Sequence, residues 1–589
     1  MGFQTMKKMA KYRNIIKTVT LVLVFVLSFV LGVHYTNEKS GYYVDEGMTL
    51  FLANGEYNGA VTSKSEYGFV DFIKKFVLKD SLSGTVNNVT GMLKDVASAG
   101  NYSVEGTVEW YDAARGMLQG DSTWVSGDEL FDQLVAERGN RFQYIQVYFN
   151  QVVDVHPPLY YFIVHTVFSI FGGRYSDFFL FGINIVFLML TAFVGYKLVS
   201  EQCGENSIIP LFFTASYMFS QGYYSCAMYY RMYAILSFWV VLTVYWHIKK
   251  INSLVQRKDY LMLGAIVLAG FGTQYYYIVF LFPLFLCCAT GMLINKEKKA
   301  FKSYLLTMIF SGIISMILWP FSLYHIIFGY RGTEAVKNLG SFGLIKKIKG
   351  TVKLVRKAVF LNSSVIMILA FIMLAVVIIM LIAKKLEFDN RNIYIAIVIS
   401  MLVYFAIITK IAPANSMRYY MCLQPILIIV LLLGANLLIK KYIHGERIIA
   451  ITGMLGSVLV LVYMIVSVVA LEPDYLYLDN RELKLGIEKE EVLSDFNCLM
   501  IAMQHGEGFP VSLKLSEYSE VMVVDQDKLE LLDINKPSGP EKDMIIYIDC
   551  NCDIENSIIS VIMAYGGGDA VLYEIESDIK DFNAYRLKI

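Results

Sequence analysis

Long apolar runs recur along the chain from residue 15 to residue 470, and no run of comparable length follows. An α-helix needs about 20 apolar residues to cross the ~30 Å hydrocarbon core of a membrane. Eleven runs approach that length and predict spans at 15–36, 177–197, 207–224, 231–248, 259–275, 276–294, 304–328, 363–383, 392–411, 419–439 and 447–470. The pattern therefore predicts a polytopic α-helical membrane protein.

The last part of the chain has a different pattern, in which short apolar runs alternate with polar helical stretches. We expect a membrane domain over 1–471 and a small α/β domain over 472–589. A glycine run at 566–568 lacks the strand and GxGxxG context of a nucleotide-binding loop, and no nucleic-acid partner is expected. The strands and the helix of the α/β domain are predicted at 521–525, 544–549, 570–575 and 554–565.

One segment decides which side of the membrane each loop faces. Residues 157–172 are apolar, but a run of about 15 residues is shorter than a span needs. If this segment does not cross, the basic pairs of the short loops all face the cytoplasm, as the positive-inside rule requires. We therefore expect 157–172 to be an interfacial helix on the outer leaflet. The basic pairs lie at 249–250, 257–258, 384–385 and 440–441.

With eleven spans, the N-terminus is predicted to be cytoplasmic and three regions extracytoplasmic. These regions are a long first loop over 37–176, a loop over 329–362, and the 472–589 domain. The charge distribution agrees: residues 472–589 hold 25 Asp and Glu against 10 Lys and Arg, whereas the whole chain has no net charge. An acidic tail on a basic membrane part indicates that the two face different compartments.

Composition narrows the class of protein further. Of 589 residues, 56% are hydrophobic and only 17% charged, with a mean hydropathy of +0.51. A soluble protein carries about 25% charged residues, so a soluble enzyme and a disordered chain are excluded. The eight cysteines show no metal-ligand spacing and no disulfide framework.

Two pairs of candidate site residues lie in the long first loop, Asp45 with Glu46 and Asp154 with His156. Asp45 and Glu46 follow the first span closely, and an acid pair at a membrane surface can act as general base, metal ligand or sugar binder. Asp154 and His156 precede Pro157-Pro158, which suit the first turn of the interfacial helix. The alternative interpretations are solvated loop acids for the first pair and a simple helix start for the second.

Two arginines open spans on the outer side. Arg231 follows Tyr230, and Arg418 precedes Tyr419. An arginine at this depth either extends toward lipid phosphates or holds a ligand phosphate through a bidentate fork. The two interpretations stay open at this point.

The 329–362 loop carries basic residues on an outer surface, where the positive-inside rule does not place them. Apolar residues at helical spacing over 345–359 predict a basic amphipathic helix. Such a helix either attracts anionic lipid heads or forms the rim of a site for a lipid-phosphate substrate, with Lys353 and Arg356 as candidate phosphate ligands.

The order of these motifs resembles the GT-C superfamily of membrane glycosyltransferases. It is most similar to the family 39 branch, which includes protein O-mannosyltransferases and the lipid A aminoarabinose transferase. The similarity covers roughly 15–470 and is best in 41–50, 154–172 and 223–240. The resemblance implies a sugar donor linked to polyprenyl phosphate and an inverting transfer outside the membrane.

The resemblance also implies roles for single residues. Asp45 matches the family's catalytic acid, Glu46 its neighbour, His156 the position that opens the interfacial helix, and Arg231 the arginine of a Glu-Ala-Arg-Met-Tyr stretch. The sequence departs from the family at Tyr229, where glutamate is frequent.

On this basis we expect a glycosyltransferase in which Asp45 is the general base. The partners are a polyprenyl-phosphate sugar, membrane lipid, and an acceptor that is a protein, a glycan or a lipid. No cofactor is certain, and a divalent metal on Asp45, Asp154 and His156 is left open. A flippase or transporter for lipid-linked sugars and a non-catalytic envelope scaffold are the alternative functions.

Overall fold

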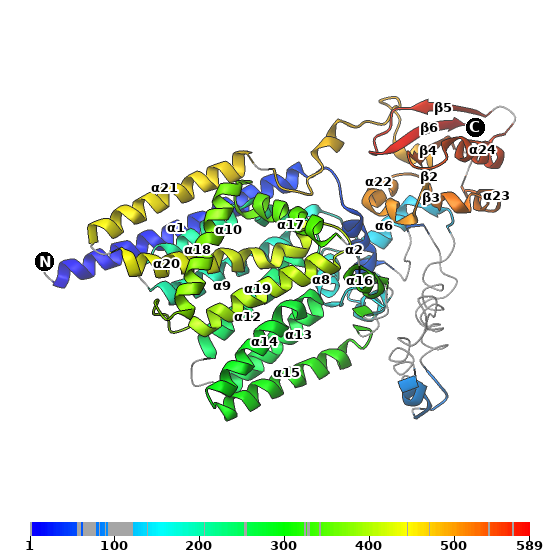
Figure 1. Cartoon of the computed structure of the whole chain (residues 1–589). Coiled ribbons are helices and arrows are strands. Elements are labelled where there is room, and N and C mark those ends of the chain that lie inside the picture. The colour runs from blue at the N-terminus through cyan, green and yellow to red at the C-terminus, as the bar shows by residue number, and fades with distance from the viewer. Residues whose placement is uncertain are drawn as a thin grey trace. The chain divides into compact units, whose positions relative to one another are not determined.

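The computed structural model divides the chain into two compact units (Figure 1). The membrane-helix unit comprises residues 1–37 and 181–474, and the loop–tail unit comprises 38–180 and 475–589. The structure describes residues 3–55, 61–62, 78–81, 83–88, 90–91, 122–137, 139–152, 154–204, 207–251, 256–322, 325–326, 330–340, 343–443, 446–470, 472–539, 542–567 and 570–589.

The membrane-helix unit is helical throughout its described residues. A 3-10 helix, η4 (Met417–Leu423), leads directly into α20. The α-helices are α1 (Phe3–Glu38), α9 (Asp177–Cys203), α10 (Ile209–Met218), α11 (Gln221–Met228), α12 (Tyr233–Lys250), α13 (Arg257–Thr273), α14 (Tyr276–Ile294), α15 (Lys298–Leu318), α16 (Tyr330–Gly340), α17 (Leu344–Val359), α18 (Ser364–Ile382), α19 (Arg391–Ile411), α20 (Gln424–Tyr442) and α21 (Glu446–Ala470).

Within the described residues, eight helices are long and apolar enough to cross a membrane. They lie in α1, α9, α14, α15, α18, α19, η4–α20 and α21. Large apolar side chains are exposed along α1, α15, α18 and α21, as expected of helices whose outer faces meet lipid rather than water. The polytopic membrane protein predicted from the sequence is therefore confirmed.

The other three predicted spans are shorter or more polar than the sequence pattern indicated. The 207–224 span breaks into α10 and α11 because Ser220 caps α11, where its side chain accepts a hydrogen bond from the Tyr223 amide. Helix α13 has 17 residues, and α12 ends in His247, Lys249 and Lys250.

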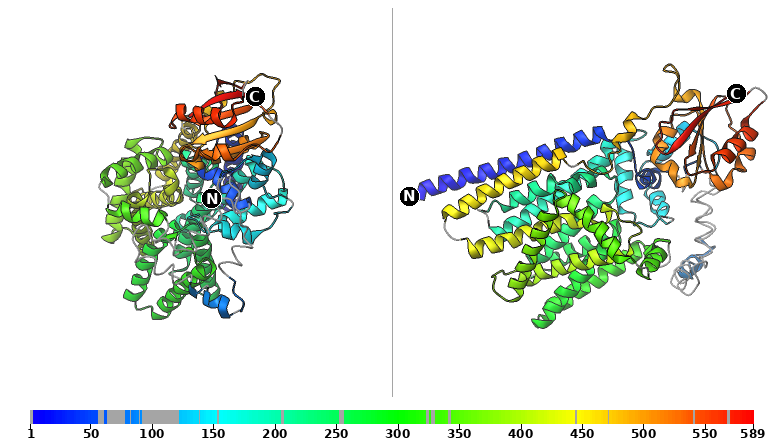
Figure 2. Two further views of the ribbon diagram at one scale, coloured as in Figure 1. Left: turned by 90° about the vertical axis from the view of Figure 1, so that its right-hand side faces the viewer. Right: turned by 45° about the horizontal axis from the view of Figure 1, so that its top comes forward.

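The loop–tail unit contains a six-stranded sheet in the order β1-β3-β2-β4-β6-β5 (Figures 1 and 2). Strands β3, β2 and β4 run parallel, and the other pairs are antiparallel. The predicted strands and helix of the tail are confirmed, whereas β2 and β6 were not predicted. The elements are β1 (Val125–Ser126), β2 (Asn497–Ala502), β3 (Glu520–Asp525), β4 (Met544–Asp549), α24 (Ile554–Tyr565), β5 (Val571–Ile575) and β6 (Phe582–Lys588).

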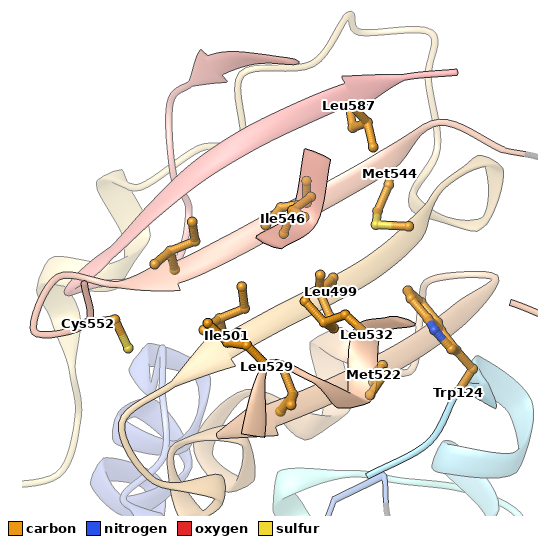
Figure 3. Packing of buried hydrophobic residues seen from close by; sticks show 13 residues of the cluster. Trp124, Leu499, Ile501, Met522, Leu529, Leu532, Met544, Ile546, Cys552 and Leu587 are labelled. Atoms are coloured by element: carbon orange, nitrogen blue, oxygen red, sulfur yellow. The ribbon is translucent and has the colours of Figure 1, made fainter. Parts of the chain in front are cut away.

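The first loop and the tail fold together as one unit. Strand β1 of the loop pairs with β3 of the tail, where Val125 lies opposite Val521. Trp124 belongs to the apolar cluster that covers one face of the sheet (Figure 3), and its indole N–H donates to the Tyr565 hydroxyl at 3.2 Å. A strand whose partner lies 396 residues further along the chain, from Val125 to Val521, thus completes the sheet edge.

Helices from the described ranges of the first loop also belong to this unit. They are α2 (Val44–Asn54), α6 (Gly127–Leu134), α7 (Tyr144–Asn150) and α8 (Leu159–Phe171). Helix α8, predicted over 157–172, has 13 residues and is about 20 Å long, which is too short to cross a membrane. The His165 side chain on α8 faces the Asn54 amide at the end of α2, which ties these two helices together.

Candidate functional site

The two acids at the start of α2 have different surroundings. Glu46 is only 1% exposed, and its carboxylate accepts hydrogen bonds from the Tyr43 amide at 2.6 Å and from the Lys39 ammonium at 3.2 and 3.3 Å. Asp45 is half-buried. Neighbouring positions on a helix point in different directions, so one acid of the pair is bound inside the unit and the other lies nearer its surface.

Lys39 is the buried partner of Glu46. Its side chain is 1% exposed, donates to the Tyr475 carbonyl at 2.7 Å, and lies 5.3 and 5.5 Å from the ring centres of Tyr42 and Tyr477. Burial lowers the pKa of Lys39, an effect that Glu46 partly opposes. Sequence reasoning missed this lysine, although its position between the first span and the acid pair was a signal.

Asp154 and His156 form a dyad in the same unit. His156 Nδ1 lies 2.8 Å from Asp154 Oδ2, and the Tyr161 hydroxyl donates to the same oxygen at 2.9 Å. When neutral His156 donates its Nδ1 proton to this carboxylate, Nε2 is the basic nitrogen. Among the described residues, no group of three or more His, Cys, Asp or Glu side chains is gathered for a metal ion. The structure therefore does not support a metal shared by Asp45, Asp154 and His156.

The two candidate arginines lie in the membrane-helix unit. Residues 223–233, including Tyr230 and Arg231, are all buried. Asn184 holds the turn between α11 and α12, because its side-chain amide donates to the Tyr229 carbonyl at 2.8 Å. The Arg231 amide donates to the same carbonyl at 2.7 Å. Arg231 is thus placed by a hydrogen-bonded turn rather than by a regular helix.

Arg418 on η4 is bound by phenols. Its guanidinium donates to the Tyr229 hydroxyl at 2.7 Å and to the Tyr419 hydroxyl at 3.0 Å, and it lies 5.0 Å from the Tyr419 ring centre. Tyr229 is the residue at which the sequence departs from the glycosyltransferase pattern that the chain resembles. The sequence did not reveal its contact with Arg418, which is 189 positions away.

The basic helix predicted over 345–359 is present as α17, but its cations have different roles. Arg356 donates to the Asn362 and Ser364 side chains at 3.1 and 2.9 Å, and therefore holds the turn into α18. Lys357 pairs with Asp474 at 2.6 Å. Lys353 is exposed, as a phosphate ligand on an outer rim would be.

An apolar cavity of about 210 Å³ lies against α17 in the same unit. Its walls come from α17, α18, α19, η4 and α20. Met417 and Tyr420 line it, and Arg418 and Tyr419 lie between these two residues in the chain. The lining residues are Val352, Val355, Val359, Met367, Phe371, Met401, Leu402, Phe405, Met417, Tyr420, Leu423, Gln424 and Leu427.

Comparison with solved structures finds ArnT from Cupriavidus metallidurans, in a form bound to undecaprenyl phosphate and in the apo state. Both are 10% identical to this chain, and each match covers 73% of this chain and 87% of ArnT. The TM-scores are 0.45 and 0.44. No protein-family model and no curated protein matches the chain.

Proposed function

We propose that this protein is a membrane glycosyltransferase of the GT-C kind, which moves a sugar from a polyprenyl-phosphate donor to an extracytoplasmic acceptor. The observation that carries the proposal is the apolar cavity whose η4 wall also bears Arg418 and Tyr419. A cavity lined almost wholly by hydrocarbon, beside a buried cation, is complementary to a ligand with an apolar chain and an anionic head.

The phenols around Arg418 suit an anionic head group. Each phenolic oxygen accepts an N–H from the guanidinium, and a phenol that accepts in this way can also donate its own proton. An arginine and two such hydroxyls stabilise negative charge on a phosphate without protonating it. Lipid phosphate is a leaving group that needs this stabilisation and no proton. Arg231 and Lys353 are proposed as further phosphate ligands.

Asp45 is proposed as the general base. An acceptor hydroxyl is a poor nucleophile until its proton is removed as the new bond forms, and a carboxylate within ~3 Å can remove it. Glu46 is buried and bound by Lys39 and the Tyr43 amide, whereas Asp45 is half-buried, so we propose Asp45 as the acid of the pair that reaches the acceptor. Attack on the face of the sugar opposite the phosphate gives an inverted product. His156, with Nδ1 held by Asp154, is the second basic group of the proposed site.

The proposed topology places this chemistry outside the cytoplasm, with the N-terminus inside. Protease added to intact spheroplasts is then expected to digest the tail. A tail that is cleaved only after lysis would reverse the topology.

The test of the function uses the purified full chain in lipid nanodiscs, with undecaprenyl phosphate as the probe. Binding is expected for the wild type and for Asp45→Asn, because the base does not hold the lipid. Cells that carry Asp45→Asn are expected to accumulate one lipid-linked sugar. Transport of that lipid-linked sugar across the membrane by Asp45→Asn would favour a flippase, and normal envelope composition in these cells would favour a scaffold.

A further inference from the structure

The start of α2 bears two carboxylates at neighbouring positions, and one of them is neutralised by a buried cation. Lys39 reaches both oxygens of Glu46, and both side chains are almost fully buried. A buried charge without a partner is costly, so a buried pair persists only when its remaining hydrogen bonds are satisfied. The Tyr43 amide and the Tyr475 carbonyl supply these bonds.

The same lysine ties the acids to the tail. The Tyr475 carbonyl that accepts from Lys39 belongs to the first residue of the tail's part of the unit. The Ser40 amide donates to the Leu476 carbonyl at 2.7 Å. One residue after Glu46, a Cβ built on Gly47 would lie 2.0 Å from the Phe509 carbonyl oxygen. The acid-bearing turn of α2 is therefore held by backbone groups of the tail on two sides.

We propose that Lys39 is a positioning residue for Asp45, an inference that rests on the proposed function. Lys39 neutralises Glu46, and it fixes the start of α2 to the tail. Asp45 is then the one acid of the pair that meets an acceptor hydroxyl. Lys39 itself touches neither substrate nor the transferred proton. The tail then contributes to the chemistry, because the Tyr475 carbonyl accepts the hydrogen bond that holds Lys39 in place.

The pH dependence of kcat/KM distinguishes this role from a purely structural one, because only the positioning role makes the acid limb depend on the charges of Lys39 and Glu46. In Glu46→Gln the negative charge next in sequence to Asp45 is removed while the ammonium of Lys39 stays, and this change favours the ionised form of Asp45. The acid limb of the kcat/KM–pH profile should move to lower pH by about half to one unit. In Lys39→Met/Glu46→Gln both charges are gone, so the acid limb should return to its wild-type position. Among the described residues, the titratable groups around the pair include Tyr42, Tyr175, Asp177, Tyr475 and Tyr477.

The experiment uses the full chain in nanodiscs with the undecaprenyl-phosphate sugar that accumulates in cells carrying Asp45→Asn, and envelope polymer as acceptor. Glu38→Gln is the matched control, because Glu38 pairs with Arg481 at the surface of the same unit, where water screens the change. Its acid limb should coincide with that of the wild type. Lys39→Arg keeps the charge and should retain most of the rate, whereas Lys39→Met should lower kcat about tenfold or more at unchanged KM for donor.

The outcomes separate the two proposals. The role of Lys39 would be overturned if the acid limb of the kcat/KM–pH profile lay at the same pH in the wild type, in Glu46→Gln and in the double variant. The proposed transferase function would remain intact in that case. A wild type without any transfer would overturn the proposed function, and the positioning role with it. A double-mutant cycle on the unfolding midpoint checks, independently of activity, that Lys39 and Glu46 are coupled in the folded protein.

Discussion

One buried cation in each unit of the molecule has a different kind of partner. In the membrane-helix unit, Arg418 is bound by two phenols, and Asn184 is used to hold backbone carbonyls. In the loop–tail unit, buried charges meet opposite charges, as in the pair of Lys39 and Glu46. The comparison teaches that the Lys39–Glu46 pair spends its charges on the fold, whereas the hydrogen bonds of Arg418 to Tyr229 and Tyr419 go to neutral acceptors.

Under the proposed function, this difference predicts different roles for the two units. The membrane-helix unit offers an apolar cavity and a cation that suit a lipid phosphate. The loop–tail unit offers a half-buried carboxylate beside a neutralised one. Variants that change one unit should therefore affect donor binding, and variants that change the other should affect the chemical step.

The largest effect is expected when the half-buried acid of α2 is removed. Loss of a general base typically slows a reaction by ~10²–10⁴-fold, so Asp45→Asn should bind undecaprenyl phosphate but transfer little sugar. Glu46→Gln should keep more activity, because Glu46 serves Lys39. Single-turnover transfer rates measure both variants. The reverse ranking would make Glu46 the base, and near-normal transfer in the double variant would remove α2 from the chemistry.

A strong effect on stability is expected where α2 meets the tail. In Gly47→Ala the new Cβ would lie 2.0 Å from the Phe509 carbonyl oxygen and 2.5 Å from its carbon, and both are backbone atoms. Overpacking of this kind costs about 1–3 kcal/mol. Thermal unfolding of the full chain should show an earlier transition, while Gly139→Ala, which meets nothing within 4 Å, should not. Equal midpoints for both variants would show that the tail yields easily at this contact.

A smaller effect is expected at the arginines. Replacement of arginine by lysine keeps the charge but loses the planar fork, so Arg418→Lys and Arg231→Lys should each weaken undecaprenyl phosphate binding by about tenfold, the loss of roughly one charged hydrogen bond. Arg257→Lys, on the exposed start of α13, is the matched control. Binding that is unchanged in all three variants would return both arginines to the role of membrane-edge anchors.

The smallest effect is a pH dependence within the tail. Burial, together with a hydrogen bond to Asp549, raises the pKa of Glu507 to about 7. The folded protein then keeps a proton that the unfolded chain releases above its ordinary value of 4.5, so stability should fall as pH rises from about 4.5 to 7. The pKa of Asp549 is lowered, because hydrogen bonds from Glu507 and Asn551 outweigh its burial, and its contribution is lost only at more acid pH.

Glu507→Gln imitates the protonated carboxyl and should flatten this dependence. The unfolding midpoint of the full chain at pH 5 and pH 7.5 measures it, with exposed Glu517→Gln as control. If the unfolding midpoint of Glu507→Gln still falls between pH 5 and pH 7.5, another group is responsible for the pH dependence.

Local pattern was enough for many elements of the fold. Strand β4 and helix α24 have the predicted bounds, because each is a short apolar run ended by turn residues. Strand β1 has two residues and exists only through its pairing with β3. Local hydrophobic periodicity does not predict pairing with a strand so far away in sequence. For this reason the sequence pattern did not predict that the first loop and the tail fold as one unit.

The candidate site shows the same limit. Asp45, Glu46, Arg231 and Arg418 were found from residue type and position alone, and their roles stay predictions. Their partners were not found, because a contact such as that between Arg418 and Tyr229 depends on how separate helices pack. Arg356 shows the converse, since its charge indicated a phosphate ligand and its contacts indicate a helix-end anchor.

The most direct test of the central claim is mass spectrometry of lipid-linked sugars and envelope polymers from cells with the wild-type protein, Asp45→Asn, or no protein. We predict that one polyprenyl-phosphate sugar accumulates in cells with Asp45→Asn and in cells with no protein, and that the same sugar disappears from one envelope acceptor in both. Identical lipid-linked sugars and identical polymers in all three would contradict it.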